Sequence, residues 1–375
     1  MAGNPFKPTA GATPPLLVGR DDTLEEFAES LDDGPGAPAR LALFTGPRGI
    51  GKTVMLTEVA DHALRRGWVS LSETATPGMI DRLTQAASAA LHGLDPATVP
   101  GRSITGGTLP IVGGGLSVSA PPVLSVAWRT EVGRLLDALE RHDTGLLITV
   151  DEVHRAARSD LRDLAATVQH LIREDRNVAL ALAGLPSAIS DLLNDDVLTF
   201  LRRATPFPLE DVPLDAVRAA LHTTITDQGR TITDQALTAA ANATGGYPFM
   251  IQLVGYHIWR KATGTSIDLD AVQAGIPAAR KRLGSTVHAT ALADLSAVDR
   301  TYLLAMSHDD DQSSTSEIAA RMRETRAYAN VYRTRLIEAG IIQATGHGYV
   351  DFAIPYLREY LREHAAHHEL DRRHR

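Results

Sequence analysis

The run from Gly46 to Thr53 constrains this chain more than any other feature. It reads Gly-Pro-Arg-Gly-Ile-Gly-Lys-Thr and matches the pattern G-x-x-x-x-G-K-[ST] without a mismatch. A short apolar run, Leu41 to Phe44, precedes it, and a helical pattern from Thr53 to Arg66 follows. A strand, a glycine-rich turn and a helix in this order predict a phosphate-binding loop, because glycines let backbone N–H groups approach phosphate oxygens at the helix N-terminus. A chance glycine-rich turn is the alternative, and it does not explain the flanking elements.

This loop assigns roles to its side chains. Lys52 is expected to reach the β and γ phosphates of a bound nucleotide, and the Thr53 hydroxyl is expected to ligate magnesium. We therefore expect ATP and Mg²⁺ as cofactors. The predicted nucleotide contacts here are Gly46, Pro47, Arg48, Gly49, Ile50, Gly51, Lys52, Thr53 and Val54.

Two further apolar runs look like strands that are buried on both faces. They are Leu146 to Val150 and Val178 to Ala183, and helical patterns such as Met79 to His92 lie between the runs. A last strand is expected at Thr205 to Leu209. The alternation predicts an α/β fold, a P-loop NTPase parallel sheet with helices on both faces.

The run that begins at Leu146 ends in an acidic pair, Asp151 and Glu152. Parallel strands present such residues at the carboxyl edge of the sheet, where ligands bind. This is the Walker B arrangement: Asp151 is expected to hold magnesium, and Glu152 to act as the general base for the attacking water. An acidic pair after a strand is often only a solvated cap, so the assignment depends on its pairing with the phosphate-binding loop. We predict Lys52, Asp151 and Glu152 as the catalytic residues.

Some neighbouring polar residues each allow two interpretations. His154 either couples the nucleotide state to the next helix or is a surface or packing residue. Ser187 follows the strand at 178–183 and is either a sensor of the γ-phosphate or a helix N-cap. Arg202 and Arg203 either supply an arginine to the phosphates, in cis or to a neighbouring subunit, or are ordinary surface arginines.

The strand signal disappears beyond Pro208. Amphipathic helices follow, and then, from about Leu292, three helical patterns and a predicted β-hairpin over 341–352. Ser296–Asp299 and Ser314–Glu317 each have capping-box spacing and are expected to begin two of these helices. We predict an α-helical lid and a winged helix-turn-helix, with boundaries at 1–209 for the ATPase domain, 210–285 for the lid, and 286–375 for the winged helix and a C-terminal helix. The Gly/Pro-rich segment 93–125 reads as a loop or hairpin insertion without an assigned role.

Composition excludes several classes of protein. A formal net charge of -8 argues against non-specific coating of nucleic acid, although a local basic face is compatible with it. Without cysteine there is no disulfide framework, thiolate metal site or cysteine nucleophile. No stretch approaches the roughly 20 apolar residues of a membrane span, and the N-terminus lacks an apolar export signal. We expect a cytoplasmic protein with no membrane partner.

With these motifs in this order, the chain resembles origin-recognition-type AAA+ ATPases and the related STAND ATPases over nearly its full length. Its lead-in, with Asn4-Pro5-Phe6 and Leu17 to Asp21, is similar to that of a group of actinobacterial ATP-binding proteins. The resemblance implies that Val18 and Gly19 lie beside the adenine. The lid turn Gly245-Gly246-Tyr247-Pro248 is similar to the STAND Gly-x-Pro pattern, which implies that Pro248 lies near the nucleotide.

The same resemblance favours a switch over a ring motor, because the sensor arginine that most AAA+ proteins carry on this lid helix is missing. The leading hypothesis is a slow ATPase that hydrolyses ATP to ADP and phosphate as a conformational switch coupled to the winged helix. The alternative is an ATP-sensing DNA-binding regulator with little turnover. Its arginines would be Arg321, Arg323, Arg326, Arg333 and Arg335. Candidate partners are ATP and ADP, DNA, a protein effector, and a second copy in a nucleotide-dependent homo-oligomer.

Overall fold

The structure is a computed structural model that describes residues 3–9, 14, 16–94, 124–195, 198–293 and 295–370. Apart from its ends, the insertion expected at 93–125 lies outside these residues. The chain forms two compact units. The sheet unit comprises residues 20–46 and 52–209, and the helical unit comprises residues 1–19, 47–51 and 210–375. Among the described helices, none has the length and apolar character that crossing a membrane requires.

A five-stranded parallel sheet in the order β2-β3-β4-β1-β5 forms the centre of the sheet unit. Its strands are β1 (Leu41–Thr45), β2 (Val69–Thr74), β3 (Leu146–Asp151), β4 (Val178–Gly184) and β5 (Thr205–Pro208). The predicted strands are confirmed, and all residues of β4 are buried, as a continuous apolar run requires. Strand β2 was not predicted, because this edge strand mixes Ser and Glu with apolar residues.

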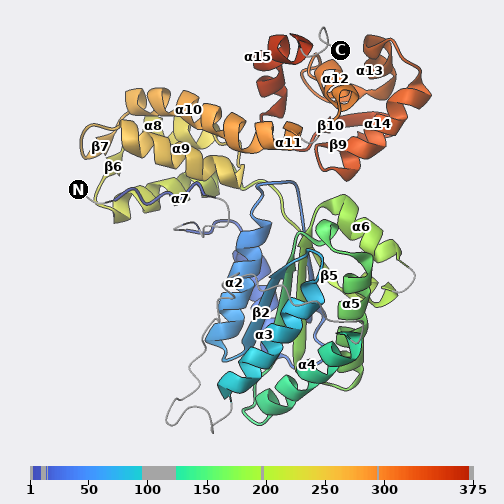
Figure 1. Cartoon of the computed structure of the whole chain (residues 1–375). Helices are drawn as coiled ribbons and strands as arrows, with labels where there is room; N and C mark the ends of the chain where they lie inside the picture. The colour runs from blue at the N-terminus through green and yellow to red at the C-terminus, as the bar shows by residue number, and fades with distance from the viewer. Residues whose placement is uncertain are drawn as a thin grey trace. The chain divides into compact units, whose positions relative to one another are not determined.

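Helices cover both faces of this sheet, and Figure 1 shows α2 and α5 on opposite sides of it. The predicted α/β class is therefore confirmed. Buried side chains of β1, β3 and β4 form the core together with those of α3, α4 and α5. The helices are α1 (Asp21–Asp32), α2 (Lys52–Arg65), α3 (Met79–Leu94), α4 (Leu124–Glu140), α5 (Arg158–Arg173) and α6 (Pro186–Asn194).

In the helical unit, a helix bundle begins after residue 210. Its members are α7 (Leu214–Asp227), α8 (Asp234–Asn242), α9 (Pro248–Lys261) and α10 (Leu269–Leu283). The short strands β6 (Thr231–Ile232) and β7 (Ser266–Ile267) pair in parallel. Helix α10 packs against α8 and α9, as Figure 1 shows. The N-terminal arm belongs to this bundle: Phe6 is buried against Gly255, and Asn4 Nδ2 donates to the Tyr256 carbonyl at 3.0 Å.

Short helices and a small sheet make up the C-terminal segment, which has its own core. After a π-helical turn (Gly284–His288) and α11 (Ala289–Ala293), the elements are α12 (Ala297–Met306), β8 (Ser313–Ser314), α13 (Thr315–Met322), α14 (Arg326–Glu338), β9 (Ile342–Gly346), β10 (Tyr349–Phe352) and α15 (Leu357–Leu370). The predicted hairpin is confirmed, because β9 and β10 pair antiparallel with β8 on the outer side of β10.

The expected helix starts in this segment had different outcomes. Ser296 and Asp299 form the predicted capping box on α12. The second capping box, at Ser314, was wrong: the Ser314 hydroxyl lies 2.6 Å from the Ser316 hydroxyl and caps no backbone N–H of α13. The hydroxyls of the two serines hydrogen-bond to each other because both residues lie at the start of the helix.

Candidate functional site

The Gly46–Thr53 loop connects β1 to α2, as its pattern predicts. Gly49 and Gly51 have φ angles of 75° and 101°, which only glycine adopts readily. Lys52 is buried at the start of α2, and its Nζ donates to the Gly46 carbonyl oxygen at 2.9 Å. The ammonium group is therefore held against the backbone of the loop, at the N-terminus of α2, where an anion is favoured.

The predicted magnesium ligands meet at the carboxyl end of β3. Thr53 Oγ1 donates to Asp151 Oδ2 at 2.5 Å, and Asp151 Oδ1 accepts the Glu152 backbone N–H at 2.8 Å. A hydroxyl and one carboxylate fit Mg²⁺, which completes its octahedron with phosphate oxygens and water. No group of three or more His, Cys, Asp or Glu side chains suited to a metal occurs in the described part of the chain. The donor set therefore fits a magnesium ion that arrives with a nucleotide.

Glu152, the predicted base, begins a 3₁₀ turn over Val153–Arg155 and has a left-handed backbone with φ 56°. Its Oε2 lies 3.1 Å from His154 Nε2. This contact was not among the two roles considered for His154. The Glu152 side chain remains 36% exposed, so water can reach the carboxylate.

The uncertain positions beyond β4 had different outcomes: Arg202 and Arg203 are exposed, as surface arginines are, whereas Ser187 does not cap a helix. Ser187 is the second residue of α6, whose N-cap is Leu185, so the N-cap interpretation was wrong. Its sensor role stays a prediction. Arg202 Nε donates to the Leu193 carbonyl at 2.7 Å, which attaches the short helix at Thr199–Arg203 to α6.

In the helical unit, Val212 contacts both the turn before α9 and Gly19. The Val212 N–H donates to the Gly246 carbonyl at 2.8 Å, and a β-carbon on Gly19 would lie 3.5 Å from Val212 Cγ1. Pro248 is the first residue of α9. Gly19, next to Val18 in the predicted base site, and Gly246, in the turn that precedes Pro248, thus both lie at Val212 although they are distant in the sequence. The base-site role of Val18, Gly19 and Pro248 stays a prediction. Val212 carried no sequence signal.

Tyr247 contacts the phosphate-binding loop itself. Its hydroxyl donates to the Arg48 carbonyl at 2.9 Å, and a β-carbon on Gly49 would collide with the same hydroxyl. Tyr247 and Arg48 both belong to the helical unit. Burial, together with the nearby Asp211 carboxylate, raises the pKa of Tyr247 well above its usual range, so the hydroxyl stays a donor. Sequence reasoning identified this turn but not this bond.

Comparison with known families identifies two segments. Residues 16–182 match the model of the AAA ATPase domain, and residues 285–361 match a domain of unknown function. Among the curated proteins, no match was found.

Solved structures resemble nearly the whole chain. The Walker-type ATPase of Pyrococcus abyssi has a TM-score of 0.66 at 15% identity, covering 92% of this chain and 96% of that chain. Cdc6p of Pyrobaculum aerophilum has a TM-score of 0.50 at 14% identity, covering 95% and 96%. At such identities the likeness concerns the fold. The chain therefore has the fold of P-loop ATPases and, over residues 16–182, a match to the AAA ATPase domain.

Proposed function

We propose that this chain binds ATP with Mg²⁺ and hydrolyses it slowly to ADP and phosphate, as a conformational switch of the STAND kind. The observation that carries the proposal is the grouping of Lys52, Thr53, Asp151 and Glu152 at the carboxyl ends of β1 and β3. These are the groups that phosphoryl transfer to water needs: a cation at the phosphates, metal ligands and a carboxylate base.

Each residue has a defined part in this reaction. Lys52 neutralises charge on the phosphates, while Thr53 and Asp151 hold the metal ion, which supplies further positive charge to the phosphate oxygens when bound. Glu152 accepts a proton as the water oxygen bonds to the γ-phosphorus. The bond from that phosphorus to the bridging oxygen breaks, and its electron pair stays with ADP.

This proposal is tested on the wild-type chain. Phosphate release that requires Mg²⁺ is expected, together with a higher melting temperature in ATP or ADP, because a ligand at about 100 times its Kd stabilises the folded state by about 2.7 kcal/mol. A chain that neither releases phosphate nor gains heat protection would refute the proposal.

Contacts within the helical unit support coupling between the nucleotide loop and the C-terminal segment. At one end of the turn around Gly245, the Tyr247 hydroxyl donates to the Arg48 carbonyl. At the other end, the Tyr356 hydroxyl donates to the Ala243 carbonyl at 3.0 Å. A β-carbon on Gly245 would fall 2.8 Å from that hydroxyl. We propose that this turn transmits the nucleotide state to the segment that we interpret as a winged helix.

Replacing Tyr356 by phenylalanine tests this coupling. Burial raises the pKa of Tyr356 to about 12, so the neutral hydroxyl donates at ordinary pH, and losing that bond is expected to cost about 1 kcal/mol of unfolding free energy. We expect nucleotide-dependent hydrogen-exchange protection of residues 285–361 to weaken, while ATP affinity is retained. Tyr349→Phe, at an exposed hairpin position, is the control. Protection that persists unchanged in Tyr356→Phe would contradict the coupling.

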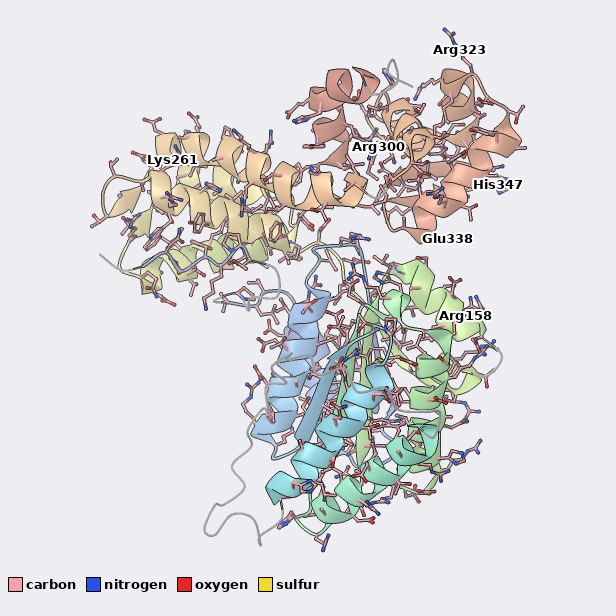
Figure 2. The ribbon with its side chains drawn as sticks, viewed as in Figure 1. Arg158, Lys261, Arg300, Arg323, Glu338 and His347 are labelled. Atoms are coloured by element: carbon pink, nitrogen blue, oxygen red, sulfur yellow. The ribbon has the colours of Figure 1, made fainter. Side chains whose placement is uncertain are left out.

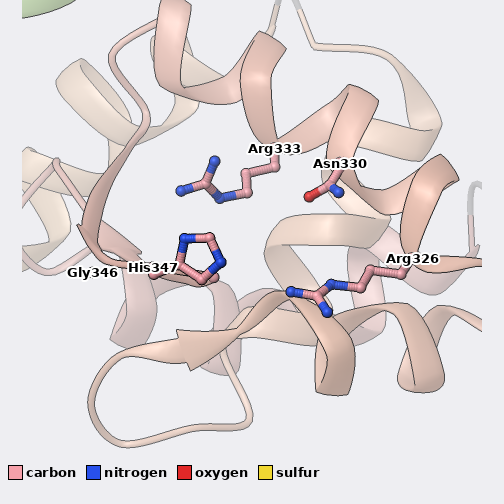
Figure 3. A pocket seen from close by; sticks show the side chains of 6 residues that line it. Arg326, Asn330, Arg333, Gly346 and His347 are labelled. Atoms are coloured by element: carbon pink, nitrogen blue, oxygen red, sulfur yellow. The ribbon is translucent and has the colours of Figure 1, made fainter.

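A second candidate function, an ATP-sensing DNA-binding regulator with little turnover, is favoured by a basic pocket in the C-terminal segment. Figure 3 shows Arg326, Asn330 and Arg333 of α14 facing His347 of the β9–β10 turn. The pocket holds about 260 Å³. Arg333 Nε is buried without a hydrogen-bond partner among the described residues. Donors gathered in this way are suited to a phosphate group.

The five arginines that the sequence suggests for this role have different surroundings. Arg321 pairs with Asp309 at 2.5 Å, and Arg335 lies 3.3 Å from Asp299. Arg323 stands at the end of α13, and Figure 2 shows it and His347 at separate places on the segment. Only Arg326 and Arg333 of the predicted set line the pocket.

DNA binding measured over a range of salt concentrations therefore distinguishes the arginines of the pocket from an arginine elsewhere on the segment. Arg326→Ala and Arg333→Ala are each expected to weaken duplex binding and to reduce the slope of log K against log salt by about one. Arg323→Asn is the matched control, because asparagine tolerates the left-handed backbone found there. A loss of affinity that is equal in all three variants would contradict the pocket, and no binding at low salt would remove this candidate.

A further inference from the structure

The backbone of Glu152 has an unusual conformation that its surroundings maintain. A positive φ is uncommon for residues other than glycine and costs on the order of 1–3 kcal/mol. Here the Glu152 N–H donates to Asp151 Oδ1 at 2.8 Å, and the Glu152 carbonyl accepts the Arg155 N–H at 2.8 Å. Backbone strain of this kind clusters at functional sites, so the position of the Glu152 carboxylate is the feature to explain.

The turn that carries His154 is anchored to the sheet. Val153 is buried, and it occupies the space that Gly184, the last residue of β4, leaves by having no side chain. A β-carbon at Gly184 would lie 2.5 Å from Val153 Cγ2. Because Val153 is locked in this way, the next residue along the 3₁₀ turn has little freedom to move its backbone.

His154 holds the Glu152 carboxylate from this anchored turn. Its Nε2 lies 3.1 Å from Glu152 Oε2, and its side chain is 23% exposed. At this distance the imidazole can donate Nε2–H to the carboxylate, because an ionised carboxylate only accepts hydrogen bonds. Such a bond would engage one carboxylate oxygen and leave Oε1 to accept a proton.

We infer that His154 is a positioning residue for Glu152, an inference that rests on the proposed ATPase function. By donating to Oε2, it restricts the carboxylate to one orientation before the reaction and frees Oε1 to accept the proton of the attacking water. A glutamate side chain otherwise samples several rotamers. Ordering it in advance means that this entropy cost is no longer part of the activation free energy. His154 itself touches neither nucleotide nor water in this role.

The test compares His154→Ala with His154→Gln, whose amide nitrogen can replace the Nε2 donor. A hydrogen bond to a charged group is worth about an order of magnitude in an equilibrium constant, so kcat is expected to fall about tenfold in His154→Ala. KM and heat protection by ATP should stay unchanged, because the residue does not contact nucleotide. In His154→Gln most of the lost kcat should return. Arg155→Ala, on the same turn and exposed, controls for damage to the turn.

The outcomes separate the two claims. If kcat in His154→Ala is unchanged or rises, or if His154→Gln loses as much as His154→Ala, the positioning role is overturned. If wild-type turnover is lost in Glu152→Gln yet unaffected in His154→Ala, only the positioning role fails. A wild-type chain without turnover would overturn the ATPase function and the positioning role together.

Discussion

Replacing Glu152 by glutamine is expected to reduce phosphate release by about 10²- to 10⁴-fold, the usual contribution of a positioned general base. The amide has the shape of the carboxylate but cannot take the proton from water. Nucleotide binding should survive, because Lys52 and Asp151 are unchanged. Single-turnover phosphate release and the melting temperature in ATP measure the two effects separately.

The control for this prediction is Glu25→Gln, on the exposed surface of α1, which makes the same chemical change away from the site. It should leave turnover and heat protection unaltered. Equal, slow hydrolysis by wild type and Glu152→Gln would show that Glu152 is not the base. Continued heat protection by ATP in that case would leave the nucleotide site intact and support the regulator with little turnover.

Replacing Lys52 by alanine is expected to weaken ATP binding by about 10- to 100-fold, the value of one to two hydrogen bonds to a charged group. The ammonium is buried and held 2.9 Å from the Gly46 carbonyl, so its charge is available to phosphates at close range. The gain in melting temperature with ATP, measured over a range of concentrations, gives the change in Kd. Turnover should fall with it.

Lys261→Ala is the matched control, because it removes an exposed lysine at the end of α9 in the helical unit (Figure 2). Its ATP affinity should equal that of wild type. If Lys52→Ala keeps its full heat protection by ATP, the loop does not bind phosphate. That result would remove the basis of the ATPase proposal, whatever its effect on turnover.

Most of the sheet was predictable because buried parallel strands have a simple sequence signature. Strand β4 is apolar without interruption, and β3 is apolar apart from Thr149 and its last residue, Asp151, since both faces of the sheet are covered by helices. The edge strand β2 was not predicted because it has one neighbour among the described strands and its exposed positions carry Ser72 and Thr74. Edge position is a property of the assembled sheet, and the local sequence does not record it.

The ion pairs of the C-terminal segment likewise could not be predicted from the local sequence. The sequence places five arginines on or beside two helices, and nothing local distinguishes them. Asp309 and Asp299, which pair with Arg321 and Arg335, lie on or just after α12 and reach these arginines only through helix packing. Which arginines line the pocket is therefore decided by tertiary contacts.

By itself, the sequence determined the parts of the site that are continuous in the chain: the Gly46–Thr53 loop, the acidic pair after β3, and the α/β alternation. Glycine freedom, helix polarity and strand burial act over a few residues, so a local pattern records them. Only the tertiary structure decided that the Tyr247 hydroxyl binds the Arg48 carbonyl, that Val153 packs over Gly184, and that His154 lies against the Glu152 carboxylate. These contacts depend on which surfaces meet when the elements pack, and packing joins residues that are remote in sequence or turned by strained backbone.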